Sequence, residues 1–232
     1  MIETVLIAAL VIAPGALIAI VLHEVAHGWA ANALGDPTAR ERGRLSLNPL
    51  RHIDPFGTVA LPLFLFAAQI LSIHRVEFLF GWAKPVPVDP RNFRHPRQDM
   101  ALVAAAGPAI NLALAFAFAT LGHGVDALPR TAGILAAEAI MFGVQINLLL
   151  MLFNLIPVPP LDGGRILVGV LPFGPARALA RLEPAGLMLV LLGLFLVPAL
   201  LRLSGVPFDP LAEILLPPLA GLRSLIFAAV GL

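Results

Sequence analysis

Apolar segments of membrane-spanning length constrain the fold of this chain more than any other feature. They cover residues 2–33, 56–73, 100–121, 132–153, 185–201 and, more weakly, 211–230. A helix needs roughly 20 apolar residues to cross a bilayer, and each segment is near that length. Of the 232 residues, 59% are hydrophobic and 12% are charged, and the mean hydropathy is +0.93. We therefore expect an all-α polytopic membrane protein with five to six transmembrane or re-entrant segments.

Composition excludes several classes of function. The formal net charge is +1 and no long basic run is present, so we expect no nucleic-acid partner. Cysteine is absent, so any metal must bind nitrogen and oxygen atoms. No serine stands in a Gly-x-Ser-x-Gly elbow. No stretch between the apolar segments is long enough to bury a core, so residues 1–232 are expected to form one membrane-embedded domain.

The positions of Lys and Arg predict how the chain enters the membrane. Basic residues cluster after the first, second and fourth apolar segments. Because cytoplasmic loops are rich in Lys and Arg, the clusters share one face only if segment 56–73 re-enters and returns to its own side. Pro62 and the short apolar piece 76–83 suit such a hairpin, and the N-terminus then lies outside. The prolines after Lys84 exclude a helix, so a small extended or β element is expected within 81–99, on the cytoplasmic side.

The first apolar segment contains the sequence His23-Glu24-Val-Ala-His27. This spacing places two imidazoles one turn apart on one face of a helix, with a carboxylate beside them. The alternative is an accidental match or a satisfied polar patch. Each ionisable group costs about 2.5–3.5 kcal/mol at the centre of a membrane helix, so three clustered there favour a metal site.

A catalytic zinc site usually has three protein ligands, so a further ligand is needed. Asp162 is the strongest candidate, at the end of the fourth segment in a stretch with Pro157, Pro159, Pro160, Gly163 and Gly164. Prolines break a helix, glycines permit close backbone approach and positive φ, and broken helix at membrane depth lines a cavity. The alternative is an interfacial turn in which Asp162 caps the next helix.

Other polar residues leave two interpretations open. Asn32, Asn111, Asn147 and Asn154 either line a water path and anchor substrate, or hold helices together. We favour Asn154 as a donor to a developing oxyanion. The histidines outside the motif, at 52, 74, 95 and 123, are expected to be ordinary solvated or interfacial residues.

Three motifs together resemble the site-2 protease family of intramembrane zinc metalloproteases. They are His23 to His27, the sequence Ala-Gly-Pro-Ala-Ile-Asn at 106–111, and residues 154–165. Residues 43–49 and 52–57 resemble its compact bacterial branch, and this chain lacks any PDZ-like or CBS-like domain. The resemblance implies three core helices, here the first, third and fourth segments, and a site near the cytoplasmic side. It implies His23, His27 and Asp162 as ligands of one zinc ion and Glu24 as the general base that activates the bound water.

The sequence thus predicts a zinc metalloendopeptidase that cleaves peptide bonds in or near transmembrane segments of other proteins. Its expected partners are those substrates and the lipid bilayer, in a prokaryotic cell membrane, with its oligomeric state left open. A metal transporter and a non-proteolytic relative that binds membrane segments are the alternatives. Replacing Glu24 by Gln distinguishes an enzyme from a carrier, since only an enzyme needs the base.

Overall fold

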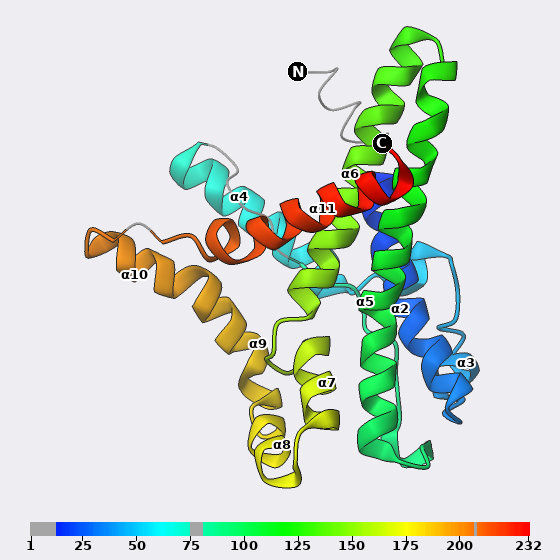
Figure 1. Cartoon of the computed structure of the whole chain (residues 1–232). Coiled ribbons are helices and arrows are strands. Elements are labelled where there is room, and N and C mark those ends of the chain that lie inside the picture. Colours follow the sequence, from blue (N-terminus) through cyan, green and yellow to red (C-terminus); the bar gives the residue numbers. More distant parts are fainter. Residues whose placement is uncertain (1–12, 75–80, 207) are drawn as a thin grey trace.

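Helices account for all regular structure in the part of the chain that the computed structural model describes, residues 13–74, 81–206 and 208–232 (Figure 1). In chain order the elements are α2 (Ala13–Ala33), α3 (Thr38–Glu41), η2 (Pro49–His52), η3 (Pro55–Ala60), α4 (Leu61–Ile73), η4 (Pro90–Asn92), α5 (Pro96–Leu121), η5 (Gly122–Ala127), α6 (Arg130–Asn154), α7 (Asp162–Val170), α8 (Phe173–Ala180), α9 (Glu183–Leu191), η6 (Leu192–Leu196), α10 (Val197–Leu203), η7 (Leu211–Leu215) and α11 (Leu216–Val230).

Helices α2, α5 and α6 form the core, and α5 lies against both of the others and against α7. Small residues of α5, among them Ala115 and Ala119, are fully buried against the α6 residues Val144 and Leu148. Small side chains let helix backbones approach closely, which is how membrane helices gain packing energy. Helix α11 crosses this pair and completes the cluster with Ile226 (Figure 1).

Five helical stretches are long and apolar enough to cross a membrane: Pro55–Ser72, Pro96–Ala127, Arg130–Asn154, Glu183–Leu203 and Ala212–Val230. The expectation of an all-α multi-pass protein is confirmed. Helix α2 is not among the five; its described part begins at Ala13 and contains the ionisable residues His23, Glu24 and His27. Its 21 residues still give a length of about 30 Å. Residues 2–12 of the predicted first segment lie outside the described residues.

The segment at 56–73 is one helix, made of η3 and α4, and does not turn back within itself. Asp54 caps its start by accepting hydrogen bonds from the N–H groups of Phe56 and Gly57. Pro62 lies where η3, a π-helical stretch, passes into α4, and the helix continues through it. The chain then returns to its starting point, since Trp82 N donates to Gly57 O at 3.1 Å. Most of the apolar piece 76–83 lies outside the described residues.

The predicted β element is not confirmed, because the described residues contain no strand. Residues 81–89 form no regular element, and the N–H groups of Trp82, Lys84 and Val86 bond to loops and side chains instead of to a neighbouring strand. Trp82 N and Lys84 N donate to the carbonyls of Gly57 and His52, and Val86 N donates to Glu24.

These donors alternate along the chain, so residues 82, 84 and 86 direct their polar groups to one edge. We call the opposite edge, formed by Ala83, Pro85 and Pro87, the outer edge. Proline has no N–H, so Ala83 supplies the one N–H of that edge, beside three carbonyl groups.

Candidate metal centre

Helix α2 brings the two histidines of the motif together. Their Nε2 atoms lie 3.1 Å apart and the rings meet edge to face, with centroids 4.6 Å apart. His23 is buried and His27 is nearly so. The four-residue spacing therefore places the two imidazoles on one face, as predicted, since positions i and i+4 lie one above the other on a helix.

Asp162 joins them from the first turn of α7, which packs against α5. Its Oδ2 atom lies 3.3 Å from His23 Nε2 and 3.4 Å from His27 Nε2. Asp162 makes no hydrogen bond that caps α7, so the alternative of a capping aspartate is not supported. The side chain is directed at the imidazoles.

Gly163 and Gly164 make this approach possible. A Cβ at Gly163 would collide with the backbone of Leu155, and one at Gly164 with the backbone of Pro159. The predicted close backbone approach is confirmed, whereas the predicted positive φ is wrong, because both glycines are helical residues of α7.

The three atoms fit a zinc ion. Tetrahedral zinc with bonds of about 2.0–2.1 Å requires ligand atoms about 3.3 Å apart. The observed separations of 3.1, 3.3 and 3.4 Å match that spacing. Asp162 Oδ2 is buried without a hydrogen-bond partner among the described residues, as expected of an atom whose partner is a metal. No other group of three such residues is close enough to hold an ion in the described part of the chain.

Each imidazole has its second nitrogen bonded elsewhere. His23 Nδ1 donates to Asn111 Oδ1 at 2.6 Å, and His27 Nδ1 donates to Val103 O at 2.8 Å. Asn111 Nδ2 in turn donates to Asn147 Oδ1 at 2.8 Å, and both amides are fully buried. A proton held on Nδ1 leaves Nε2 with its lone pair for the metal. Asn111 and Asn147 therefore support the site and do not line a water path.

Gly107 of α5 lies directly against both ligands. A Cβ at this position would stand 2.5 Å from His23 Cε1 and 2.5 Å from His27 Nε2. Gly107 and Asn111 are four residues apart and share one face of α5. Both residues lie in the motif at 106–111, but these roles were not predicted from it. The sequence contains a signal for these roles, because a glycine and an amide four residues apart in an apolar helix indicate a face that contacts polar groups.

Glu24 and Asn154 line the same cleft as the three ligands, in a volume of about 360 Å³. Glu24 Oε2 accepts a hydrogen bond from Val86 N at 2.9 Å. Asn154 Nδ2 donates to Leu150 O at 3.0 Å, within its own helix. The structure thus brings every predicted site residue to one cleft. The oxyanion role of Asn154 stays a prediction.

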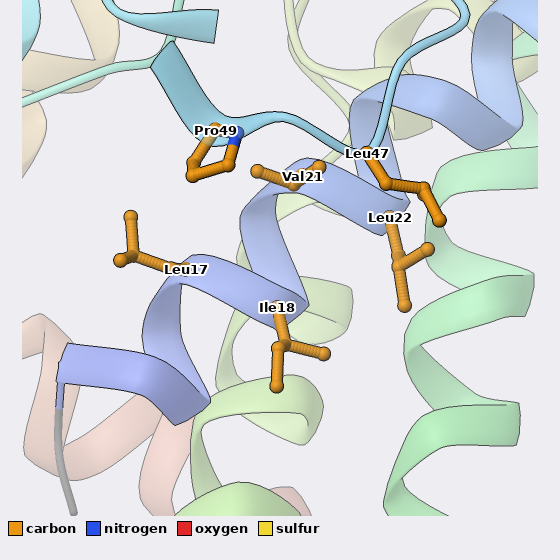
Figure 2. A pocket seen from close by; sticks show the side chains of 6 residues that line it. All are labelled: Leu17, Ile18, Val21, Leu22, Leu47 and Pro49. Atoms are coloured by element: carbon orange, nitrogen blue, oxygen red, sulfur yellow. The ribbon is translucent and has the colours of Figure 1, made fainter. Parts of the chain in front are cut away.

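Figure 2 shows another pocket, beside α2. By the periodicity of a helix, the α2 residues that line it lie on the face opposite His23 and His27. Leu17, Ile18, Val21 and Leu22 line it from α2, together with Leu47 and Pro49. All six side chains are apolar, so this pocket contributes nothing to the metal centre.

Asp36, just beyond the end of α2, holds the extended segment to the core. It is fully buried and accepts hydrogen bonds from Asp89 N at 2.8 Å and Asn92 Nδ2 at 2.7 Å, and also from the backbone and hydroxyl of Thr38. Burial opposes ionisation of Asp36, but the hydrogen bonds from Thr38, Asn92 and Asp89 outweigh it and lower its pKa. Hydrogen bonds from Arg91 lower the pKa of Asp89 to about 2.

Helix α9 is attached to the turn that carries Asp162. Arg165 Nη2 donates to Glu183 Oε1 at 2.7 Å, which ties α7 to the start of α9. Gly186 of α9 packs directly on the backbone of Pro159 and on Pro160. From the sequence, Arg165 could either extend to the lipid headgroups or fix the Asp162 turn, and these contacts favour the second role.

Comparisons with known proteins agree with this geometry. The model of peptidase family M50 matches residues 125–196, which include Asn154 and Asp162. YwhC of Bacillus subtilis, whose name describes it provisionally as a zinc metalloprotease, is 40% identical over 190 residues, which cover 78% of each chain. Rip2 of Mycolicibacterium smegmatis, with a name of the same kind, is 32% identical over 188 residues, 81% of this chain and 67% of its own. No solved structure matches.

Proposed function

Since this chain belongs to peptidase family M50, the site-2 protease family, and is a zinc metallopeptidase of multi-pass membrane type, we propose that it cleaves transmembrane segments of other membrane proteins. One observation carries the proposal: three ligand atoms at zinc spacing and the carboxylate of Glu24 share one cleft within a bundle of membrane-length helices. His27 is six residues from the end of α2, or about 9 Å below it.

In the proposed mechanism, His23, His27 and Asp162 would hold a zinc ion, which would supply an activated water and a positive charge close to the scissile carbonyl. Glu24 takes the proton of the attacking water and returns it to the leaving amine. Asn154, whose amide donates to Leu150 at rest, stabilises the negative charge that develops on the carbonyl oxygen.

A substrate helix must unwind before it is cut, because its carbonyl groups are occupied by hydrogen bonds within the helix. We propose that the unwound stretch pairs with the outer edge formed by Ala83, Pro85 and Pro87. Ala83 and Pro85 line the cleft beside the ligands. The carbonyls of this edge accept hydrogen bonds, so the substrate donates its own N–H groups.

The site is proposed to face the cytoplasm of a prokaryotic cell. Support comes from the return of the chain beside its starting point, where Trp82 N bonds to Gly57 O. Because Gly57 and Trp82 lie side by side, the chain between them enters and leaves from one side, and the basic clusters then share the cytoplasmic face.

The test measures zinc content and cleavage of a transmembrane-segment reporter for the purified wild type and three variants. Glu24→Gln is expected to keep one zinc per chain and to lose cleavage, while Asp162→Ala loses both. Glu138→Gln is the control, because Glu138 is an exposed carboxylate of α6 outside the cleft and its variant should resemble the wild type. Cleavage by Glu24→Gln at the wild-type rate would overturn the proposed role of Glu24, and a wild type without zinc would overturn the site.

A further inference from the structure

One oxygen of the Glu24 carboxylate has a fixed partner. Oε2 accepts a hydrogen bond from Val86 N at 2.9 Å, and Val86 is buried against Gly28 of the same helix. A glutamate side chain has several rotatable bonds and can point in different directions from its helix. Anchoring one oxygen leaves Oε1 as the atom that is free to exchange a proton.

We propose that the main-chain N–H of Val86 positions the Glu24 carboxylate for proton transfer, and that Asp36 is the positioning residue that holds the segment carrying this N–H. The inference rests on the general-base role proposed above for Glu24. It assigns to the extended segment a part in the chemical step, separate from any contact of its outer edge with substrate.

Asp36 suits this role because it attaches the segment to the same helix that carries Glu24. Its own N–H donates to Ala31 O of α2 at 2.9 Å, so its position is fixed relative to that helix. Its carboxylate accepts from Asp89 N, three residues beyond Val86. The stretch from Val86 to Asp89 is therefore hydrogen-bonded at one end to Glu24 of α2 and at the other end to Asp36, just beyond α2. A buried, fully bonded carboxylate makes a rigid attachment.

A second attachment holds the segment on the other side of Val86. Arg44 is buried and its Nη2 donates to Lys84 O at 2.7 Å, while Lys84 N donates to His52 O at 2.8 Å. Val86 is thus held between Lys84 and Asp89. Because its two neighbours, Pro85 and Pro87, have no N–H, Val86 carries the one main-chain donor of residues 85–87, and neither neighbour can replace it.

The expected effect falls on turnover. A displacement of about 1 Å in a reacting group can lower a rate about 100-fold. The zinc ligands are held by α2, α5 and α7 without the extended segment, so loss of the Val86 bond should leave zinc content unchanged. We expect kcat to fall about 10- to 100-fold with KM unchanged.

The main test compares two substitutions at one position, in the full-length protein in detergent. Val86→Pro removes the N–H from a backbone that already lies extended between two prolines. Val86→Ala keeps the N–H but removes part of the buried side chain. The expected result is a kcat for Val86→Pro about 10- to 100-fold below that of Val86→Ala, with equal KM and equal zinc content. Equal kcat for the two variants, or a change confined to KM, would overturn the inference.

Asp36→Asn tests the positioning residue. An asparagine has one acceptor oxygen, so it cannot receive all the hydrogen bonds that Asp36 receives, and kcat should fall while KM and zinc content stay the same. Glu41→Gln is the matched control, because Glu41 is an exposed carboxylate of the neighbouring helix α3 and its variant should behave as the wild type. An Asp36→Asn variant with wild-type kcat would remove Asp36 from the inference.

Glu24→Gln in the same series separates the two proposals. If Glu24→Gln is inactive while Val86→Pro turns over like Val86→Ala, the positioning inference fails alone. If Glu24→Gln turns over like the wild type, the proposed role of Glu24 fails and the positioning inference fails with it.

Discussion

Gly107→Ala should remove zinc from this protein although alanine is the better helix former. In a helix interior, alanine is favoured over glycine by about 0.5–1 kcal/mol. Against this gain, the added Cβ would stand 2.5 Å from one atom of each histidine, whereas ordinary contact begins at 3.4 Å. Both imidazoles must therefore move by about 1 Å, several times the roughly 0.2 Å that a metal–ligand distance tolerates. We expect zinc affinity to fall by about 100-fold or more, at the upper limit of the effects known for residues that support ligands.

The assay is metal content after purification, followed by titration against a zinc chelator of known affinity. Gly221→Ala is the matched control, because Gly221 lies in α11 and a Cβ there meets nothing within 4 Å. The control should keep its zinc and unfold at the same or a slightly higher temperature. If Gly107→Ala binds zinc as tightly as the control does, the close packing of α5 on the ligands does not constrain the site and the reasoning is refuted.

Further predictions concern the surroundings of the ligands. Asn111→Leu removes the acceptor that fixes the His23 tautomer, so zinc affinity should fall about 10- to 100-fold, and chelator titration that shows no change would contradict this. Acid should loosen the attachment of the extended segment, because the hydrogen bonds that hold this segment to the Asp36 carboxylate also lower the pKa of Asp36 in the folded protein. The stability that Asp36 contributes is complete above its unfolded pKa, near 4, and is lost as the pH falls through its lower folded value. Thermal unfolding between pH 5 and 2 should show a smaller decline for Asp36→Asn than for the wild type, and parallel curves would contradict the assignment.

Local pattern was enough to predict the parts of the site that belong to one element. The spacing of His23 and His27 fixes their relation on any helix, and the apolar segments predicted α5, α6 and the C-terminal helices within a few residues. Asp162 is 135 residues from His27, and its place was predicted from motif resemblance together with the need for another ligand. Spacing carries no information about distances between elements.

Contacts that depend on packing between elements were not predictable in this way. The bond from Val86 N to Glu24 joins positions 62 residues apart and involves a main-chain group that every non-proline residue has. Asn111 was recognised as a polar residue of an apolar segment with two interpretations open, and its partner could be identified only when α5 was placed against α2. The absence of a strand at 81–89 was unpredictable for the same reason. The acceptors for the main-chain N–H groups of this segment are side chains and loop carbonyls, which only the packing brings close.

The outer edge has a consequence for how copies of this protein meet. With Pro85 and Pro87 on it, the edge presents carbonyl oxygens and the single N–H of Ala83. If two such edges lay side by side, the carbonyl oxygens of one would face the carbonyl oxygens of the other. They could not pair through main-chain hydrogen bonds, as exposed strands of neighbouring molecules often do. A foreign peptide that keeps its N–H groups has no such conflict. The prolines thus let the edge pair with other chains but not with the same edge of another copy, which disfavours self-association through this segment.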